Sequence, residues 1–126
     1  MKSVLTGALA ALARAALALA ACAAPALAHT QLVDSYPANK QLVLKPLHAI
    51  KLVFSGKADA LYSVVRLKDS KGEVVAQATQ KSASKELILP TPSLMPGEYH
   101  IVYRVLSVDG DVIEGKLDFS VHGLEA

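Results

Sequence analysis

Apolar and polar residues alternate one by one along most of the chain after residue 28, which is the period of strands with one buried face. In the run Ile50-Lys51-Leu52-Val53-Phe54, for example, the first, third and fifth side chains are large and apolar. No apolar stripe with the three-to-four-residue spacing of a helix occurs after residue 28. The pattern therefore predicts an all-β fold.

Turn residues separate the apolar runs at intervals typical of a β-sandwich or barrel. We expect about seven strands among the candidate runs at 31–35, near 42–44, and at 50–54, 62–67, 73–78, 86–89, 99–106 and 112–121. Gly72, the Pro96-Gly97 pair and Asp109-Gly110 supply the backbone freedom or rigidity that tight turns need.

The alternation also predicts which side chains form the core, each contributing about 1.5–3 kcal/mol when buried. The expected core is Leu32, Ile50, Leu52, Phe54, Val65, Leu67, Val75, Leu87, Leu89, Tyr99, Ile101, Tyr103, Val105, Leu117, Phe119 and Val121.

The first 28 residues follow a different pattern. Lys2 and Arg14 are their only charges, and an Ala/Leu-rich run leads to Ala26-Leu27-Ala28, a small-x-small site of the kind signal peptidase accepts. The run from 15 to 24 is shorter than the roughly 20 apolar residues a spanning helix needs. We therefore expect a signal peptide over 1–28, a single domain over 29–126, and a periplasmic location.

A second cleavage site is available to the same leader. Leu19-Ala20-Ala21-Cys22 has the form of a bacterial lipobox, and cleavage before Cys22 would give a lipoprotein in which His29 is internal. Cleavage after Ala28 instead makes His29 the N-terminus, where its amine and its imidazole can chelate one metal ion together.

Composition narrows the possible functions of residues 29–126. Removing Lys2 and Arg14 from the 13 basic residues leaves 11, which balance the 11 acidic ones, and no basic cluster indicates nucleic-acid binding. There is no cysteine after Cys22, so disulfides and thiolate sites are excluded. Met95 is the only methionine in this part, so a multi-thioether Cu(I) site is excluded too.

Several segments in order resemble the CopC family of periplasmic copper-binding (copper resistance) proteins. They are the leader ending before His29, the Ser35-Tyr36-Pro37-Ala38 motif, the strand 50–55, and the segments 94–99 and 103–110. The resemblance covers essentially all of 29–126. It implies an Ig-like Greek-key β-sandwich, preceded by a cleaved signal peptide, that binds Cu(II) in copper homeostasis or resistance, as a carrier or a buffer.

The resemblance also implies ligands and partners. In the family, copper is held by the N-terminal amine and imidazole and by an Asp-x-His pair, here matched by Asp109-Gly110-Asp111. We therefore expect His29, Asp109 and Asp111 as metal ligands, Cu(II) as the bound ion, and a monomer. An inner-membrane copper transporter of the CopD family is the implied partner.

Two departures from the family pattern keep an alternative open. Asp111 stands where the family has histidine, and Gly56 stands where it often has a supporting glutamate. Asp109-Gly110-Asp111 is also what a tight hairpin turn looks like. The alternative is an Ig-like interaction module that has lost the metal site.

The other three histidines add no expected metal ligand, and no catalytic motif is apparent. His48 and His100 are expected at the surface, and His122 lies near the chain end. No Ser/His/Asp spacing, nucleophile elbow or phosphate loop occurs, so we do not expect an enzyme.

Overall fold

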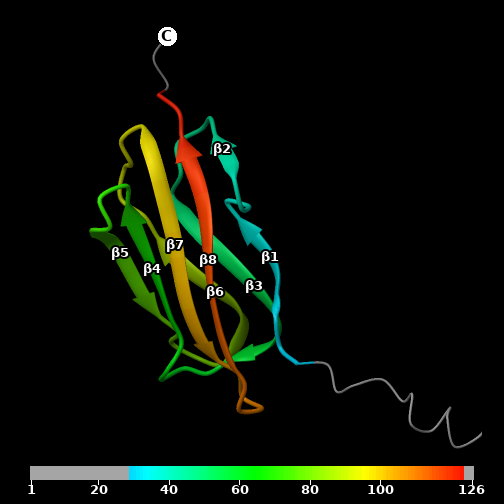
Figure 1. The fold of residues 1–126 in the computed structure, drawn as a ribbon. Helices are drawn as coiled ribbons and strands as arrows, with labels where there is room; N and C mark the ends of the chain where they lie inside the picture. The colour runs from blue at the N-terminus through cyan, green and yellow to red at the C-terminus, as the bar shows by residue number, and fades with distance from the viewer. Residues whose placement is uncertain (1–28, 124–126) are drawn as a thin grey trace, which may run out of the picture.

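The computed structural model describes residues 29–123, which form two β-sheets packed face to face (Figure 1). The strands are β1 (Leu32–Tyr36), β2 (Gln41–Val43), β3 (Ala49–Ala58), β4 (Val64–Asp69), β5 (Val74–Thr79), β6 (Ser84–Pro90), β7 (Gly97–Leu106) and β8 (Val112–Val121). The expectations for 1–28, the signal peptide and the Cys22 lipobox, lie outside the described residues.

One sheet has the order β1-β3-β6 and the other β2-β8-β7-β4-β5. All pairings are antiparallel except β2 with β8, which run parallel. The chain changes sheets at every connection except β4–β5 and β7–β8. The expectation of an all-β, Ig-like sandwich is thus confirmed, with eight strands in place of about seven.

Alternate residues from both sheets meet in a single core. The fully buried side chains include Ile50, Leu52 and Phe54 of β3, and Phe54 meets the ring of Tyr103 edge to face at 5.7 Å. Most predicted core residues are buried, but Leu32, Val75, Leu117 and Val121 are only partly covered. Val43, Leu47 and Ala58 are buried although the alternation did not single them out.

Most strand boundaries differ from the prediction by one or two residues, and the largest difference is at the end of β3. β3 continues to Ala58, four residues beyond the predicted end at Phe54. β4 starts at Val64 because the Asp59 carboxylate accepts hydrogen bonds from the amides of Leu61 and Tyr62, which close a turn there.

The two ends of the sandwich carry different segments (Figure 1). The start of β1 and the β7–β8 turn lie at one end, called here the bend end. The β2–β3 connection, the β6–β7 connection and the end of β8 lie at the other, called here the far end. Among residues 29–123, no helix is long and apolar enough to cross a membrane.

Candidate metal centre

The β7–β8 turn is a tight bend over residues 107–111. The Ser107 amide donates to the Asp111 carbonyl at 2.7 Å, and the Gly110 amide donates to the Ser107 carbonyl at 2.9 Å. Gly110 has φ 96°, a left-handed conformation that glycine adopts at little cost. The Asp-Gly-Asp sequence therefore does form the hairpin turn that its residues favour.

Ser107 holds the bend from inside. Its buried hydroxyl oxygen accepts hydrogen bonds from the amides of Asp109 at 3.2 Å and Asp111 at 3.1 Å. Both acidic residues thus have a fixed backbone while their carboxylates stay free. Sequence reasoning missed Ser107, although a serine two residues before an acidic turn is a known backbone-capping signal.

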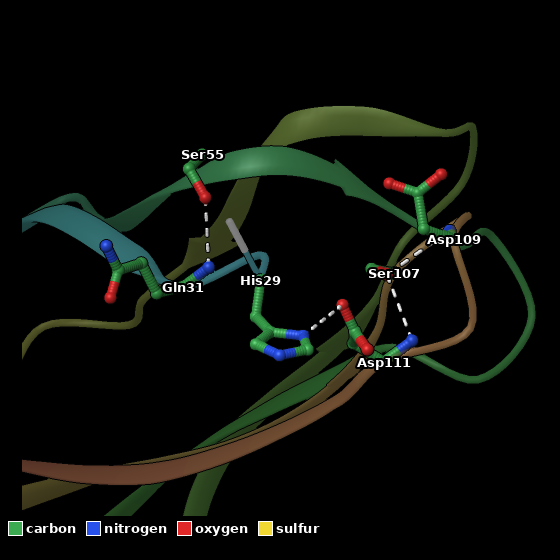
Figure 2. Close-up of polar contacts among 6 residues, drawn as sticks. All are labelled: His29, Gln31, Ser55, Ser107, Asp109 and Asp111. Carbon is green, nitrogen blue, oxygen red and sulfur yellow. Dashed lines mark hydrogen bonds and ion pairs between the residues drawn. The ribbon is translucent and has the colours of Figure 1, made fainter. Parts of the chain in front are cut away.

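His29 lies beside this bend because β1 pairs with β3. At the start of β1, the Gln31 amide donates to Ser55 Oγ at 3.0 Å, and the Ser55 amide donates to the Gln31 carbonyl at 2.9 Å. The His29 side chain is 79% exposed, and its Nδ1 lies 3.5 Å from Oδ2 of Asp111, which is 37% exposed (Figure 2). Two residues far apart in sequence therefore face each other across the end of the sandwich.

Asp109 is placed differently from Asp111. Its carboxylate points away from the His29 ring, and Ser107 lies between it and Asp111 in Figure 2. Within residues 29–123, no three His, Cys, Asp or Glu side chains come together as a ready-made metal cluster. Of the three expected ligands, the structure brings His29 and Asp111 together and leaves Asp109 on the same bend but turned outward.

Gly56 leaves room for a neighbouring side chain. A Cβ atom added at Gly56 would overlap the hydroxyl of Thr30, which is a buried residue next to His29 in the chain. Thr30 therefore occupies the space that a glutamate side chain at position 56, as in the CopC pattern, would need. Nothing in the sequence alone links residue 30 to residue 56, because the contact arises from the β1–β3 pairing.

Another histidine–aspartate pair lies away from the bend, on the outer face of the larger sheet. His100 Nδ1 donates to Asp118 Oδ1 at 2.6 Å, across the directly paired strands β7 and β8. This hydrogen bond is the largest cause of a lowered Asp118 pKa, and Lys116 and Lys40 lower that pKa further. Because the bond occupies one His100 ring nitrogen and half the carboxylate, we assign the pair a structural role.

The other two histidines lie at the far end. His48 follows the buried Leu47 in the β2–β3 connection, and His122 follows the last residue of β8. Both are exposed, as expected for His48. Neither can join the bend, because the two ends of the sandwich are separated by the length of β7 and β8 (Figure 1).

The bend end can bind a cation more readily than it can perform acid–base chemistry. It presents an imidazole and a carboxylate to solvent, and both are ligands for divalent first-row metals. The free backbone amine of His29, once residues 1–28 are removed, would add a second nitrogen on the same residue. The donors present therefore fit a cupric ion, which accepts nitrogen and oxygen ligands in tetragonal geometry.

Comparisons with known proteins identify the family of the chain. Residues 32–122 match the family model of the CopC domain. Protein YobA of Escherichia coli (strain K12) is 35% identical over 98 residues, which cover 75% of this chain and 79% of YobA.

Solved structures give the same family. The crystal structure of CopC from Methylosinus trichosporium OB3b matches with a TM-score of 0.71 and 37% identity, over 78% of this chain and 98% of that one. PcoC, described as a methionine-rich copper resistance protein from Escherichia coli, matches with a TM-score of 0.64 and 25% identity, over 75% of this chain and all of PcoC. The two-sheet fold and the family match lead to one conclusion: the chain belongs to the CopC family.

Proposed function

We propose that the protein is a periplasmic Cu(II)-binding protein that holds one ion at the bend end, through the His29 amine and imidazole and the Asp111 carboxylate. The observation that carries the proposal is the 3.5 Å approach of His29 Nδ1 to Asp111 Oδ2. The known relatives support copper as the cargo, since PcoC is described as a copper resistance protein.

The N-terminal position gives His29 its special value. A free α-amine has a pKa of about 7.7–8.0, so it must lose a proton before it binds, and the ion assists that loss. Because the amine and the imidazole belong to the same residue, an ion bound by one nitrogen is already close to the other. Cu(II) lies at the top of the affinity order for such donors, which favours it over Zn(II) or Ni(II).

We include Asp109 as the third residue of the proposed site, where it would supply a fourth donor group. Its carboxylate reaches an ion beside His29 only after turning from the orientation in Figure 2, so we expect it to contribute less than Asp111. The backbone of both residues is already fixed by Ser107, and only side-chain rotation is needed. Waters complete the coordination.

The biological role follows from the location. Cleavage after Ala28 would release residues 29–126 into the periplasm as a monomer with the chelating terminus free, and the mass of the secreted protein tests this. There the protein would act as a carrier or buffer in copper homeostasis, and a transporter of the CopD family is the proposed partner.

The decisive experiment changes only the position of the amine. Protein that begins at His29 is compared with protein that carries one extra alanine before His29, and with a control that carries the extra alanine at the C-terminus. Titration with Cu(II), followed by electron paramagnetic resonance, should show one tight site with two nitrogens in the first and third proteins. The N-terminal extension should weaken that site by at least about tenfold, the range that loss of even an outer-sphere partner costs. Equal binding by all three proteins would refute the amine chelate.

One observation favours a second function, an Ig-like interaction module that has lost the metal site. Gly56 and Asp111 replace two groups of the family pattern, and Thr30 fills the space beside Gly56. A ligand that binds only the folded state raises Tm. If saturating Cu(II) leaves the Tm of the protein that begins at His29 unchanged, the interaction module is the better assignment.

A further inference from the structure

A cavity of about 330 Å³ lies at the far end of the sandwich, opposite the proposed copper site. Three chain segments surround it: the β2–β3 connection, the β6–β7 connection and the end of β8. The lining residues are Lys45, Pro46, Leu47, His48, Thr91, Ser93, Leu94, Pro96, Val121, His122 and Gly123. Two of the protein's four histidines thus line one cavity, from segments that are distant in sequence.

Hydrogen bonds fix the backbone of both histidines. The Thr91 amide donates to the His48 carbonyl at 2.9 Å, and the Thr91 hydroxyl donates to the Leu47 carbonyl at 3.0 Å. The His122 amide donates to the Val43 carbonyl at 3.0 Å, which extends the parallel β2–β8 pairing by one residue. The cavity walls are therefore part of the sheet framework.

The side chains of this cavity differ from those at the bend end. Among residues 29–123, no carboxylate lines this cavity, and neither imidazole makes a hydrogen bond to another of these residues. Unengaged imidazole nitrogens are ligands for Cu(II), Ni(II) and Zn(II), and Cu(II) binds the most tightly of these. Lys45 adds a positive charge to the lining, which disfavours a cation.

We propose that His48 and His122 form a second, weaker divalent-metal site, with two imidazole nitrogens and water as ligands and a preference for Cu(II). It binds less tightly than the bend end because it lacks both a carboxylate and a chelating amine. The site is independent of the proposed function, since none of its residues lies at the bend.

The test isolates this site by disabling the first one. The His29→Ala variant is titrated with CuCl2 alone, while nuclear magnetic resonance follows the side-chain signals of His48, His100 and His122. The paramagnetic ion should broaden the signals of His48 and His122 together and spare His100, which is engaged by Asp118. Broadening of only one of the two, or of neither, would overturn the proposal.

Two further variants and one control, all made in the His29→Ala protein, sharpen the result. His48→Ala should weaken the remaining Cu(II) binding by at least about tenfold, and His122→Ala should do the same, whereas His100→Ala should leave it unchanged. A Cu(II) affinity that survives both cavity variants would rule the site out.

The charge of Lys45 separates a cation site from an anion site. Lys45→Gln should leave Cu(II) binding unchanged or tighten it, because a like charge is removed. Weaker Cu(II) binding in this variant would contradict a simple imidazole site. Inorganic phosphate serves as the probe for an anion site. If phosphate shifts the His48 and His122 signals and Cu(II) does not broaden them, the cavity binds an anion and the metal-site proposal is wrong.

Discussion

Residues 29–123 contain two histidine–aspartate pairs that use the same kinds of atoms in different ways. His100 Nδ1 and Asp118 Oδ1 are 2.6 Å apart, with side chains 28% and 49% exposed. His29 Nδ1 and Asp111 Oδ2 are 3.5 Å apart, with side chains 79% and 37% exposed. Residue type alone does not tell them apart.

The difference comes from what holds each pair. His100 and Asp118 are direct cross-strand partners on β7 and β8, so the sheet sets their spacing. His29 precedes β1 and Asp111 precedes β8, so the two are not cross-strand partners and no strand pairing sets the spacing of their side chains. A short, fixed bond occupies the donors, whereas a loose approach leaves ring nitrogens and carboxylate oxygens available to an ion.

The comparison shows what to look for in a candidate metal site of this kind. A histidine whose best partner is already at hydrogen-bond distance has little left to offer a metal. A histidine held near a carboxylate, but beyond good hydrogen-bond distance, keeps its ring nitrogens available to bind a metal ion together with that carboxylate. The predictions below test whether these two pairs separate in this way.

The largest change should follow from Asp111→His, which restores the Asp-x-His pattern. A second imidazole beside His29 is a stronger Cu(II) donor than a carboxylate. We expect Cu(II) to bind at least about tenfold more tightly, within the range by which single groups alter metal sites. Electron paramagnetic resonance should count three nitrogens in place of two. An unchanged nitrogen count would mean that residue 111 does not face the ion.

A smaller change is expected from removing one charge at each pair in turn. Asp111→Asn should weaken Cu(II) binding by about tenfold and leave Tm nearly unchanged, because its pair is loose. Asp118→Asn is the matched control and should lower Tm slightly while leaving Cu(II) affinity unchanged. Calorimetric titration and thermal melts of both variants decide the matter. Equal effects of the two variants on copper would show that the pairs are not distinct.

The smallest effect concerns acid stability. The His100 hydrogen bond holds the pKa of Asp118 below its usual range. A carboxyl with a lowered folded-state pKa contributes stability that is fully present above the unfolded pKa of about 3.9 and is lost as the pH falls through the folded value. Between about pH 5 and about pH 2, Tm should therefore fall more in the wild type than in Asp118→Asn. Parallel curves would contradict a role for this pair in acid stability.

The sequence is enough to predict the sheets but not how the ends of the sandwich are completed. Alternation at Ile50, Leu52 and Phe54 reports burial directly, because one face of β3 meets the core. Val43 belongs to a three-residue strand without alternation, and its burial follows from the parallel β2–β8 pairing. Leu47 is buried in the β2–β3 connection, where no strand pattern applies. Local patterns cannot encode a pairing between strands so distant in the chain.

The candidate sites divide in the same way. The expectation for His29 rests on the leader and the family pattern, and a pattern of that kind can be read from sequence. The orientation of Asp109 depends on the fold of the bend around Ser107, which no spacing rule supplies. The sequence does not predict that His48 and His122 line one cavity, because their segments meet only in the folded chain.

The contact between Gly56 and Thr30 couples the side chains that these two positions can hold. A glutamate introduced at 56 would collide with the threonine hydroxyl, so that change alone should destabilise the fold. Shrinking residue 30 first, as in Thr30→Gly, would open the space the new side chain needs. The effect of a glutamate at position 56 should therefore depend on which residue occupies position 30. Melting curves of Gly56→Glu, Thr30→Gly and the double variant would show this coupling as non-additive changes in the free energy of unfolding.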